Sequence, residues 1–143
     1  MAAPDPNVRT RPLSPHLDVY KWQVQMLTSI LHRATGIALV AGMLGLVWGL
    51  VALAGGEKSW ATFATCATSL LGKLVLLGFS WALAYHLING VRHLVQDAGH
   101  GYAIPDFVRS SWISIIGSVV LLVVVWAIVL RRLVTRPQFA SQV

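Results

Sequence analysis

Apolar residues in this chain form three long blocks instead of alternating with polar ones. Residues 34–56 contain no charged side chain over 23 positions, and residues 110–130 contain none over 21. At a rise of about 1.5 Å per residue, either block can cross the ~30 Å hydrocarbon core of a bilayer. The pattern therefore predicts two transmembrane helices, over about residues 30–54 and 110–130.

The middle block is less regular, because Lys73 interrupts it and Arg92 follows after only 18 uncharged residues. A lysine in the first turn of a helix can extend its ammonium group back to the interface. We therefore predict a third transmembrane helix over about residues 69–92. The predicted fold class is an all-α membrane protein with a single membrane-anchor domain over 1–143, an extended N-terminal arm and helix entry at 1–27, and a C-terminal tail at 131–143.

The composition excludes most soluble classes of protein. Of the 143 residues, 56% are hydrophobic and only 11% are charged, whereas a soluble domain carries about a quarter of charged residues. A cytosolic enzyme, a nucleic-acid-binding module and a disordered tail are all disfavoured. The single Cys66 cannot form an intrachain disulfide and lacks zinc-ligand spacing, so we interpret it as a packing residue.

The net charge of +6 bears on membrane topology. Four cations, Arg9, Arg11, Lys21 and Arg33, precede the first charge-free run, and the positive-inside rule then places the N-terminus in the cytoplasm. Three arginines after the last helix favour the opposite orientation, but the first helix usually decides. The first 33 residues contain no signal-peptide-like apolar run, and Asp5 and Asp18 interrupt any acid-free presequence. We therefore expect a multi-pass protein of a bacterial inner membrane, in preference to the mitochondrial inner membrane.

His86 is the most informative polar residue of the middle block. It precedes Arg92 by six residues, or about 9 Å along the helix axis, where an ionisable group needs a protein, water or metal partner. Gly78, Ala82 and Gly90 recur with it at four-residue intervals and so share one helical face. Such a face could admit a planar macrocycle with His86 as its axial ligand. A neutral histidine bonded to a neighbouring helix and a proton relay are the alternatives.

Two further histidines lie near the predicted interface. His93 is two turns closer to water than His86 and adjoins Arg92, so both could pair with haem propionates or simply form a solvated helix end. His32 adjoins Arg33, which we expect to hold it about 9 Å from the level of His86. His32 is then excluded as a second axial ligand, and a bis-histidine haem would need a histidine from another chain.

Ser29 and Arg33 are four residues apart, and therefore share a helix face, with Gly36 one turn deeper. A guanidinium and a hydroxyl can together orient the carbonyl oxygen of a small apolar ligand that enters from the lipid. The commoner alternative is an arginine that contacts lipid phosphates.

Three segments carry a more specific signal. The first is Arg-Pro-Leu-Ser-Pro-His-Leu at 11–17, followed by Tyr20. The second is Ser-Ile-Leu-His-Arg-Ala-Thr-Gly at 29–36, which looks like a signature S-x-x-H-R-x-[ST]-G. The third is Tyr-His-Leu-Ile-Asn-Gly-Val-Arg-His-Leu at 85–94 with Asp97 and Gly99, similar to H-x-x-x-G-x-R-H-x-x-x-D-x-G. Together they resemble the cytochrome b large membrane-anchor subunit of succinate dehydrogenase, respiratory complex II.

The resemblance implies a role for each matched residue. His86 would be the axial ligand of haem b, with a second histidine from a small membrane-anchor subunit. Ser29 and Arg33 would help to form a ubiquinone site near the iron-sulfur subunit. The residues around the haem propionates would be His32, Arg92 and His93, and Asp97 would be a structural or docking residue. The helices would then be part of a heteromeric bundle in the lipid bilayer, on which a flavoprotein subunit and the iron-sulfur subunit dock.

On this interpretation the chain passes electrons from the iron-sulfur subunit to ubiquinone, in the respiratory chain and the tricarboxylic acid cycle. It holds no succinate site and no catalytic residue of its own, because it lacks a soluble domain, a dinucleotide fingerprint and the cysteines of iron-sulfur clusters. Two alternatives stay open. One is an anchor subunit of a fumarate reductase or of another quinone-linked dehydrogenase, and the other is a purely structural small membrane protein.

Overall fold

The computed structural model describes residues 20–135, and this part of the chain is helical with no β-strand. Its four helices are α1 (Val24–Ala54), α2 (Glu57–Thr68), α3 (Leu70–Asp97) and α4 (Ile104–Thr135). The helices α1, α3 and α4 are long and apolar enough to cross a membrane. The predicted all-α fold class with three membrane-crossing helices is therefore confirmed.

Each long helix continues past the charge-free run that predicted it. Helix α1 begins at Val24, α3 ends only at Asp97, and α4 begins at Ile104, so Arg92 and His93 belong to a helix and not to a loop. The polar side chains at these ends do not stop the helices, because their backbone groups still pair within the helix. The connection between α3 and α4 therefore contains only residues 98–103, and both Gly99 and Gly101 adopt the positive φ angles that such a tight connection needs.

The short helix α2 was not predicted. Gly56, at φ 88°, reverses the chain after α1, and the Ser69 hydroxyl accepts a hydrogen bond from the Gly72 amide at 3.1 Å to begin α3. Phe63 of α2 packs edge to face on Trp48 of α1, with 5.0 Å between ring centroids. The sequence prediction looked for runs long enough to span a bilayer, and a helix of 12 residues is too short for that criterion.

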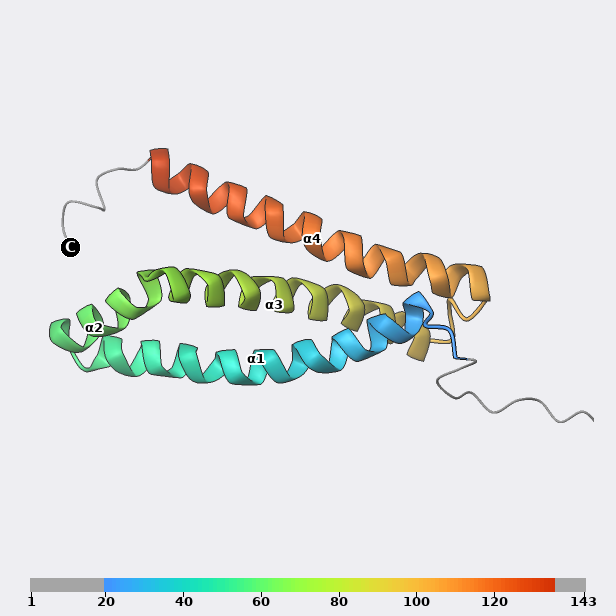
Figure 1. Ribbon diagram of the computed structural model, residues 1–143, viewed down its shortest axis with the longest axis horizontal. Coiled ribbons are helices and arrows are strands. Elements are labelled where there is room, and N and C mark those ends of the chain that lie inside the picture. Colours follow the sequence, from blue (N-terminus) through green and yellow to red (C-terminus); the bar gives the residue numbers. More distant parts are fainter. Residues whose placement is uncertain (1–19, 136–143) are drawn as a thin grey trace, which may run out of the picture.

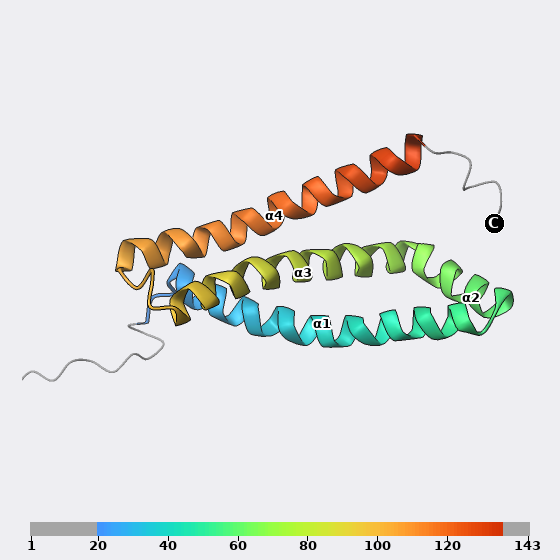
Figure 2. The same ribbon diagram turned by 180° about the vertical axis from the view of Figure 1, so that it is seen from behind.

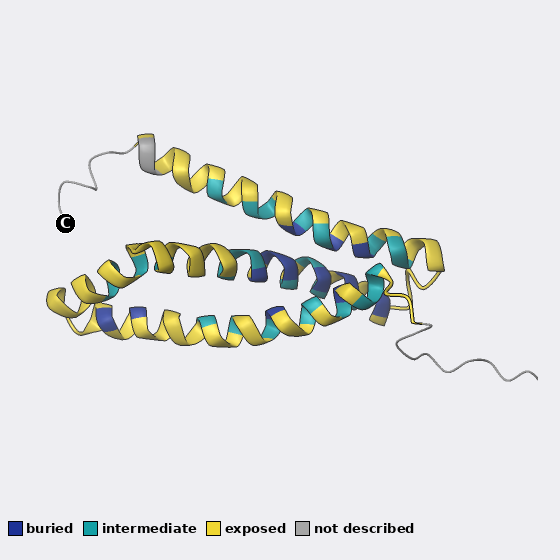
Figure 3. Ribbon diagram, in the orientation of Figure 1, coloured by how far each residue is buried: buried dark blue, intermediate teal, exposed yellow. Residues whose placement is uncertain are grey.

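Helices α1 and α3 lie side by side and antiparallel, while α4 packs on the second half of α3 and diverges from it toward its own C-terminal end (Figures 1 and 2). Buried residues gather where α1 begins, α3 ends and α4 begins (Figure 3). We call this region, residues 24–36, 85–97 and 104–111, the polar end of the bundle. Elsewhere large apolar side chains are exposed around the helices, as expected for surfaces that face lipid or other helices.

A row of serines allows α4 to pack closely on α3. Ser111, Ser114 and Ser118 are at most 1% exposed, and each donates its hydroxyl to a carbonyl of its own helix. Small residues at this spacing let two helix backbones approach within a membrane. Gly117 in the same region lies against Ile88 of α3.

The predicted N-terminal arm and C-terminal tail are described only in part. Residues 1–19, with the segment Arg11–Leu17, lie outside the described residues, as do residues 136–143. The tail was predicted to begin at Arg131, but α4 continues to Thr135.

Candidate functional site

Helices α1 and α3 bring three histidines together at the polar end. The rings of His32 and His86 stack, with 4.0 Å between centroids and 13° between planes. The ring of His93 lies 5.1 Å from His32, tilted by 43°. We call His32, His86 and His93 the histidine cluster.

The expectation that His32 lies about 9 Å from the level of His86 is wrong. That expectation assumed that Arg33 and Arg92 lie at the same depth at the membrane–water interface. Arg33 is exposed, whereas Arg92 is 8% exposed and lies within α3. From the start of α1 to His32 is about 12 Å along the helix, and from His86 to the end of α3 is about 16 Å. The difference in depth between the two Cα atoms is small enough for the side chains to span, so the two rings come into contact.

His86 has a second partner on α1. Its Nδ1 lies 3.3 Å from Oγ1 of Thr35, which is 4% exposed. The same hydroxyl lies 2.8 Å from the carbonyl oxygen of Leu31 and 3.0 Å from that of His32. Within the described part of the chain, no hydrogen bond reaches Nε2 of His86.

The small residues around His86 allow α1 to pack closely against α3, and they do not leave an open flat face on α3. A Cβ atom on Gly36 would lie 3.2 Å from Cε1 of His86, and one on Gly90 would lie 3.9 Å from Cε1 of His32. Ala82 is buried, and only Gly78 faces open space. The glycine row therefore packs helices, and the space beside the ring of His86 is taken by His32. The in-plane lone pair of Nε2, where a metal binds, is not covered by this stacking.

Arg92 points to a different neighbour from the histidines. Its Nε donates to Oγ of Ser110 at 2.9 Å and its Nη1 to Oδ1 of Asn89 at 3.3 Å. Its guanidinium carbon lies 4.5 Å above the ring of Phe107. Arg92 is therefore anchored between α3 and α4, while His93 beside it on the chain turns to α1.

Ser29 and Arg33 lie on α1 at the edge of the polar end. Ser29 is half-buried and Arg33 is exposed. Neither side chain has a hydrogen bond or ion pair to another residue within 20–135. Asp97 is the exposed last residue of α3, and His100 is exposed in the loop that follows.

Several buried polar atoms at the polar end lack a partner among the described residues. They are Gln25 Oε1, His32 Nδ1, Asn89 Nδ2, Arg92 Nη2 and Gln96 Nε2. All belong to the first part of α1 or the last part of α3. Unpaired polar atoms are costly in the low-dielectric interior of a membrane protein. These atoms, with donors and acceptors unused among the described residues, lie together at the polar end of the bundle.

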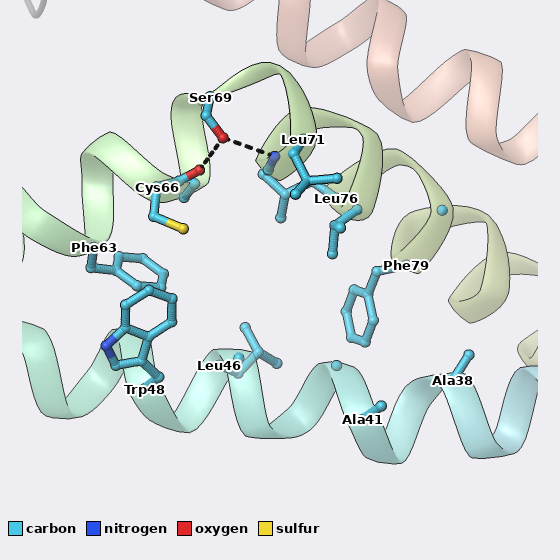
Figure 4. Close-up of a pocket in the computed structure, with 16 residues that line it drawn as sticks. Ala38, Ala41, Leu46, Trp48, Phe63, Cys66, Ser69, Leu71, Leu76 and Phe79 are labelled. Atoms are coloured by element: carbon cyan, nitrogen blue, oxygen red, sulfur yellow. Dashed lines mark hydrogen bonds between the residues drawn. The ribbon is translucent and has the colours of Figure 1, made fainter.

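An apolar cavity of about 550 Å³ lies at the opposite end, where α2 joins α1 and α3 (Figure 4). Gly45 and Gly78 border it, and Phe79 projects across it toward α1. Cys66, predicted to be a packing residue, is exposed and lines this cavity, because α2 packs through Phe63 and leaves the thiol beside open space. The cavity extends along α1 and α3 to Ala38 and Phe79, about two helical turns from His86, and its lining is almost entirely apolar.

Sequence reasoning missed the residues that support the cluster. Thr35, Asn89 and Ser110 bind the predicted site residues, and the hydroxyl of Tyr85 donates to the carbonyl of Thr28 at 2.9 Å across α1 and α3. The available signal was the presence of hydroxyl and amide side chains inside otherwise apolar segments. Such residues usually face another helix in a membrane protein.

Comparison with known proteins agrees with these features. Residues 7–127 match the family model described as succinate dehydrogenase/fumarate reductase transmembrane subunit. The succinate dehydrogenase cytochrome b556 subunit of Paracoccus denitrificans is 47% identical over 119 residues, which are 83% of this chain and 92% of that protein.

Two other relatives show the range of the similarity. The cytochrome b556 subunit of Rickettsia felis is 39% identical over 81% of this chain and 90% of its own length. The mitochondrial cytochrome b560 subunit of Mus musculus is 41% identical over 79% of this chain and 66% of its own length.

Proposed function

The chain belongs to the succinate dehydrogenase/fumarate reductase transmembrane subunit family, and we propose that it is the haem b-binding anchor subunit that passes electrons from an iron-sulfur subunit to ubiquinone. The observation that carries this proposal is the histidine cluster, in which α1 and α3 hold His86 well inside α3. A structural helix pair has no need for three imidazoles and several unpaired polar atoms at one end.

His86 is the proposed axial ligand of haem b. The residues present fit this group, because Nε2 of His86 has no partner among the described residues and its lone pair stays clear of the stacked ring of His32. When bound, haem supplies a one-electron redox centre. His32, whose Nδ1 is buried and unpaired, and His93 are the donors proposed to face the propionates. Arg92 would reach them through its unpaired Nη2, while its other nitrogens hold Ser110 and Asn89.

The second axial ligand is proposed to come from the small membrane-anchor subunit. The stacking of His32 on His86, with 4.0 Å between ring centroids, supports a second ligand from another chain, because two imidazoles stacked on each other would not both bind one iron in this arrangement. This reason replaces the difference in depth expected from the sequence.

Ser29 and Arg33 are the proposed quinone-binding residues. Both lie on α1 next to the histidine cluster, with polar groups that bind no other described residue. The Arg33 guanidinium and the Ser29 hydroxyl can donate to a quinone carbonyl oxygen and stabilise the negative charge that develops on it during reduction. The long apolar tail of ubiquinone would remain in the lipid.

The remaining parts of the proposal concern the assembly. The chain acts as a single membrane-anchor domain in a bacterial inner membrane, with the N-terminus in the cytoplasm, and Asp97 at the exposed end of α3 helps to dock the soluble subunits. The flavoprotein subunit holds the succinate site. The family description also includes fumarate reductases, but the relatives are named as succinate dehydrogenase subunits, which favours succinate oxidation.

Purification of the tagged chain from solubilised host membranes tests the proposed function. We expect a flavoprotein, an iron-sulfur subunit and a second small membrane subunit to co-purify, with b-type haem and succinate:ubiquinone reductase activity. Recovery of the chain with fumarate reductase subunits, or alone and without haem, would contradict it.

A further inference from the structure

We infer that Thr35 is a positioning residue for the haem ligand, because its hydroxyl accepts a hydrogen bond from Nδ1–H of His86 and thereby presents Nε2 as an unprotonated nitrogen to the iron. This inference rests on the proposed function for the identity of the metal group. On this inference Thr35 acts through His86.

The direction of the hydrogen bond follows from the neighbours of the hydroxyl. Oγ1 of Thr35 lies 2.8 Å from the carbonyl oxygen of Leu31 and 3.0 Å from that of His32, both closer than Nδ1 of His86 at 3.3 Å. A carbonyl oxygen can only accept, so two oxygens at 2.8 Å need the hydroxyl proton between them. If that proton pointed to Nδ1 of His86 instead, Oγ1 of Thr35 and the carbonyl oxygen of Leu31 would face each other with no proton between them and would repel.

The hydroxyl proton therefore belongs to the carbonyl of its own helix, and a lone pair of Oγ1 faces the histidine. Nδ1 of His86 must then carry the proton that this hydrogen bond uses. In a neutral imidazole the other nitrogen, Nε2, is left with a free lone pair, which is the form that binds a metal.

Burial makes this arrangement rigid. Thr35 is 4% exposed, and its β-branched side chain has few rotamers in a helix. Gly36 leaves just enough room for the ring, since a Cβ there would lie 3.2 Å from Cε1 of His86. Thr35, Gly36 and the stacked ring of His32 together fix the orientation of His86 before a haem arrives.

The bond also affects the electronic properties of the ligand. An acceptor on Nδ1–H makes an imidazole more basic and a better electron donor, which stabilises the oxidised iron. Loss of the acceptor should therefore raise the midpoint potential of the haem. It should also weaken haem retention, by about 10- to 100-fold if the effect resembles that of other partners of metal-bound histidines.

Thr35→Val tests the inference in the intact, purified complex, because valine keeps the shape of threonine and removes the hydroxyl, which is both the acceptor for Nδ1–H of His86 and the donor to the carbonyls of its own helix. The measurements are haem content per flavin and the haem midpoint potential by redox titration. We expect a higher potential and lower haem retention in detergent. Thr35→Ser, which keeps the hydroxyl, should restore both. Should the valine variant assemble poorly, Thr35→Ala removes the same group with a better helix former.

Thr28→Val is the matched control. Thr28 is equally buried on α1 and its hydroxyl also donates to its own helix, to the Gln25 carbonyl at 2.9 Å, but the hydroxyl has no bond to His86. If Thr35→Val matches Thr28→Val and the unmodified complex in both measurements, the inference is wrong. His86→Ala in the same series separates the haem-ligand proposal from the role of Thr35. If the His86→Ala variant retains haem, His86 is not the ligand. If it loses haem while Thr35→Val is unchanged, only the role of Thr35 is wrong.

Discussion

The imidazole rings of His32 and His86 stack across the interface between α1 and α3, 4.0 Å apart and nearly parallel. Antiparallel packing brings the first third of α1 beside the last part of α3, and Gly36 and Gly90 keep the two backbones close enough for the rings to meet. The stacked pair places His32 next to the proposed haem ligand, on the face of its ring.

His32→Phe should leave the haem with two histidine ligands. Phenylalanine keeps a flat ring that can stack on His86 but removes both nitrogen atoms, so only the contact with the propionates is lost. We expect a low-spin b-type spectrum and low-spin electron paramagnetic resonance signals, with an altered midpoint potential. A high-spin haem in this variant would identify His32 as an axial ligand.

Arg33→Leu should reduce ubiquinone reduction strongly while succinate oxidation with an artificial dye acceptor survives. Loss of a charge-assisted hydrogen bond to the quinone oxygen is worth about 1.5–3 kcal/mol, or roughly ten- to a hundredfold in rate. Arg109→Leu is the control, because Arg109 is also an exposed cation at the start of α4. Equal quinone reductase rates in the two variants would refute the assignment of Arg33.

Ser110→Ala should destabilise the contact between α3 and α4. The change leaves Nε of buried Arg92 without its partner at 2.9 Å, and hydrogen bonds between membrane helices contribute about 0.6 kcal/mol on average and up to about 1.7. Thermal unfolding of the detergent-solubilised complex should therefore begin at a lower temperature. In an Arg92→Met background the same serine change should have almost no effect, and equal losses in both backgrounds would contradict the proposed coupling.

Gly42→Ala should disturb the packing of α1 on α3. A Cβ atom at this position would clash with the ring of Phe79, so the ring must move, at a cost of about 1–3 kcal/mol. Gly45→Ala, where no atom lies within 4 Å, should be nearly neutral. Thermal stability measured for both variants checks the difference, and Phe79→Leu should rescue Gly42→Ala if the predicted clash is the cause.

Much of the architecture could be predicted because membrane spans are determined by hydropathy over about 20 residues. The charge-free runs predicted α1 and α4, and α3 was predicted even though Lys73 interrupts its apolar run. The ends of the helices were harder to predict. Arg92 and His93 were interpreted as residues at the membrane interface, but the helix continues past them to Asp97. The short α2 fell below the length of a membrane span.

The composition of the candidate site was easier to predict than its geometry. Residue types and spacing singled out His86, Ser29 and Arg33, whose roles remain proposals. The relative level of His32 and His86 could not be read from spacing, since it depends on where each helix begins and on how the two helices are staggered. Thr35 fills the [ST] position of the signature at 29–36 but was given no role, because a threonine in an apolar run commonly bonds to its own helix; only the packed structure shows His86 beside its hydroxyl.

The most direct test of the proposed function is the reduced-minus-oxidised absorption spectrum of the purified complex carrying His86→Ala, beside His100→Ala, which changes an exposed loop histidine of the same chain. We predict that the b-type absorption bands disappear with His86→Ala and persist with His100→Ala, while the flavoprotein still oxidises succinate with a dye. Undiminished b-type bands in the His86→Ala complex would contradict the assignment of His86 as the haem ligand.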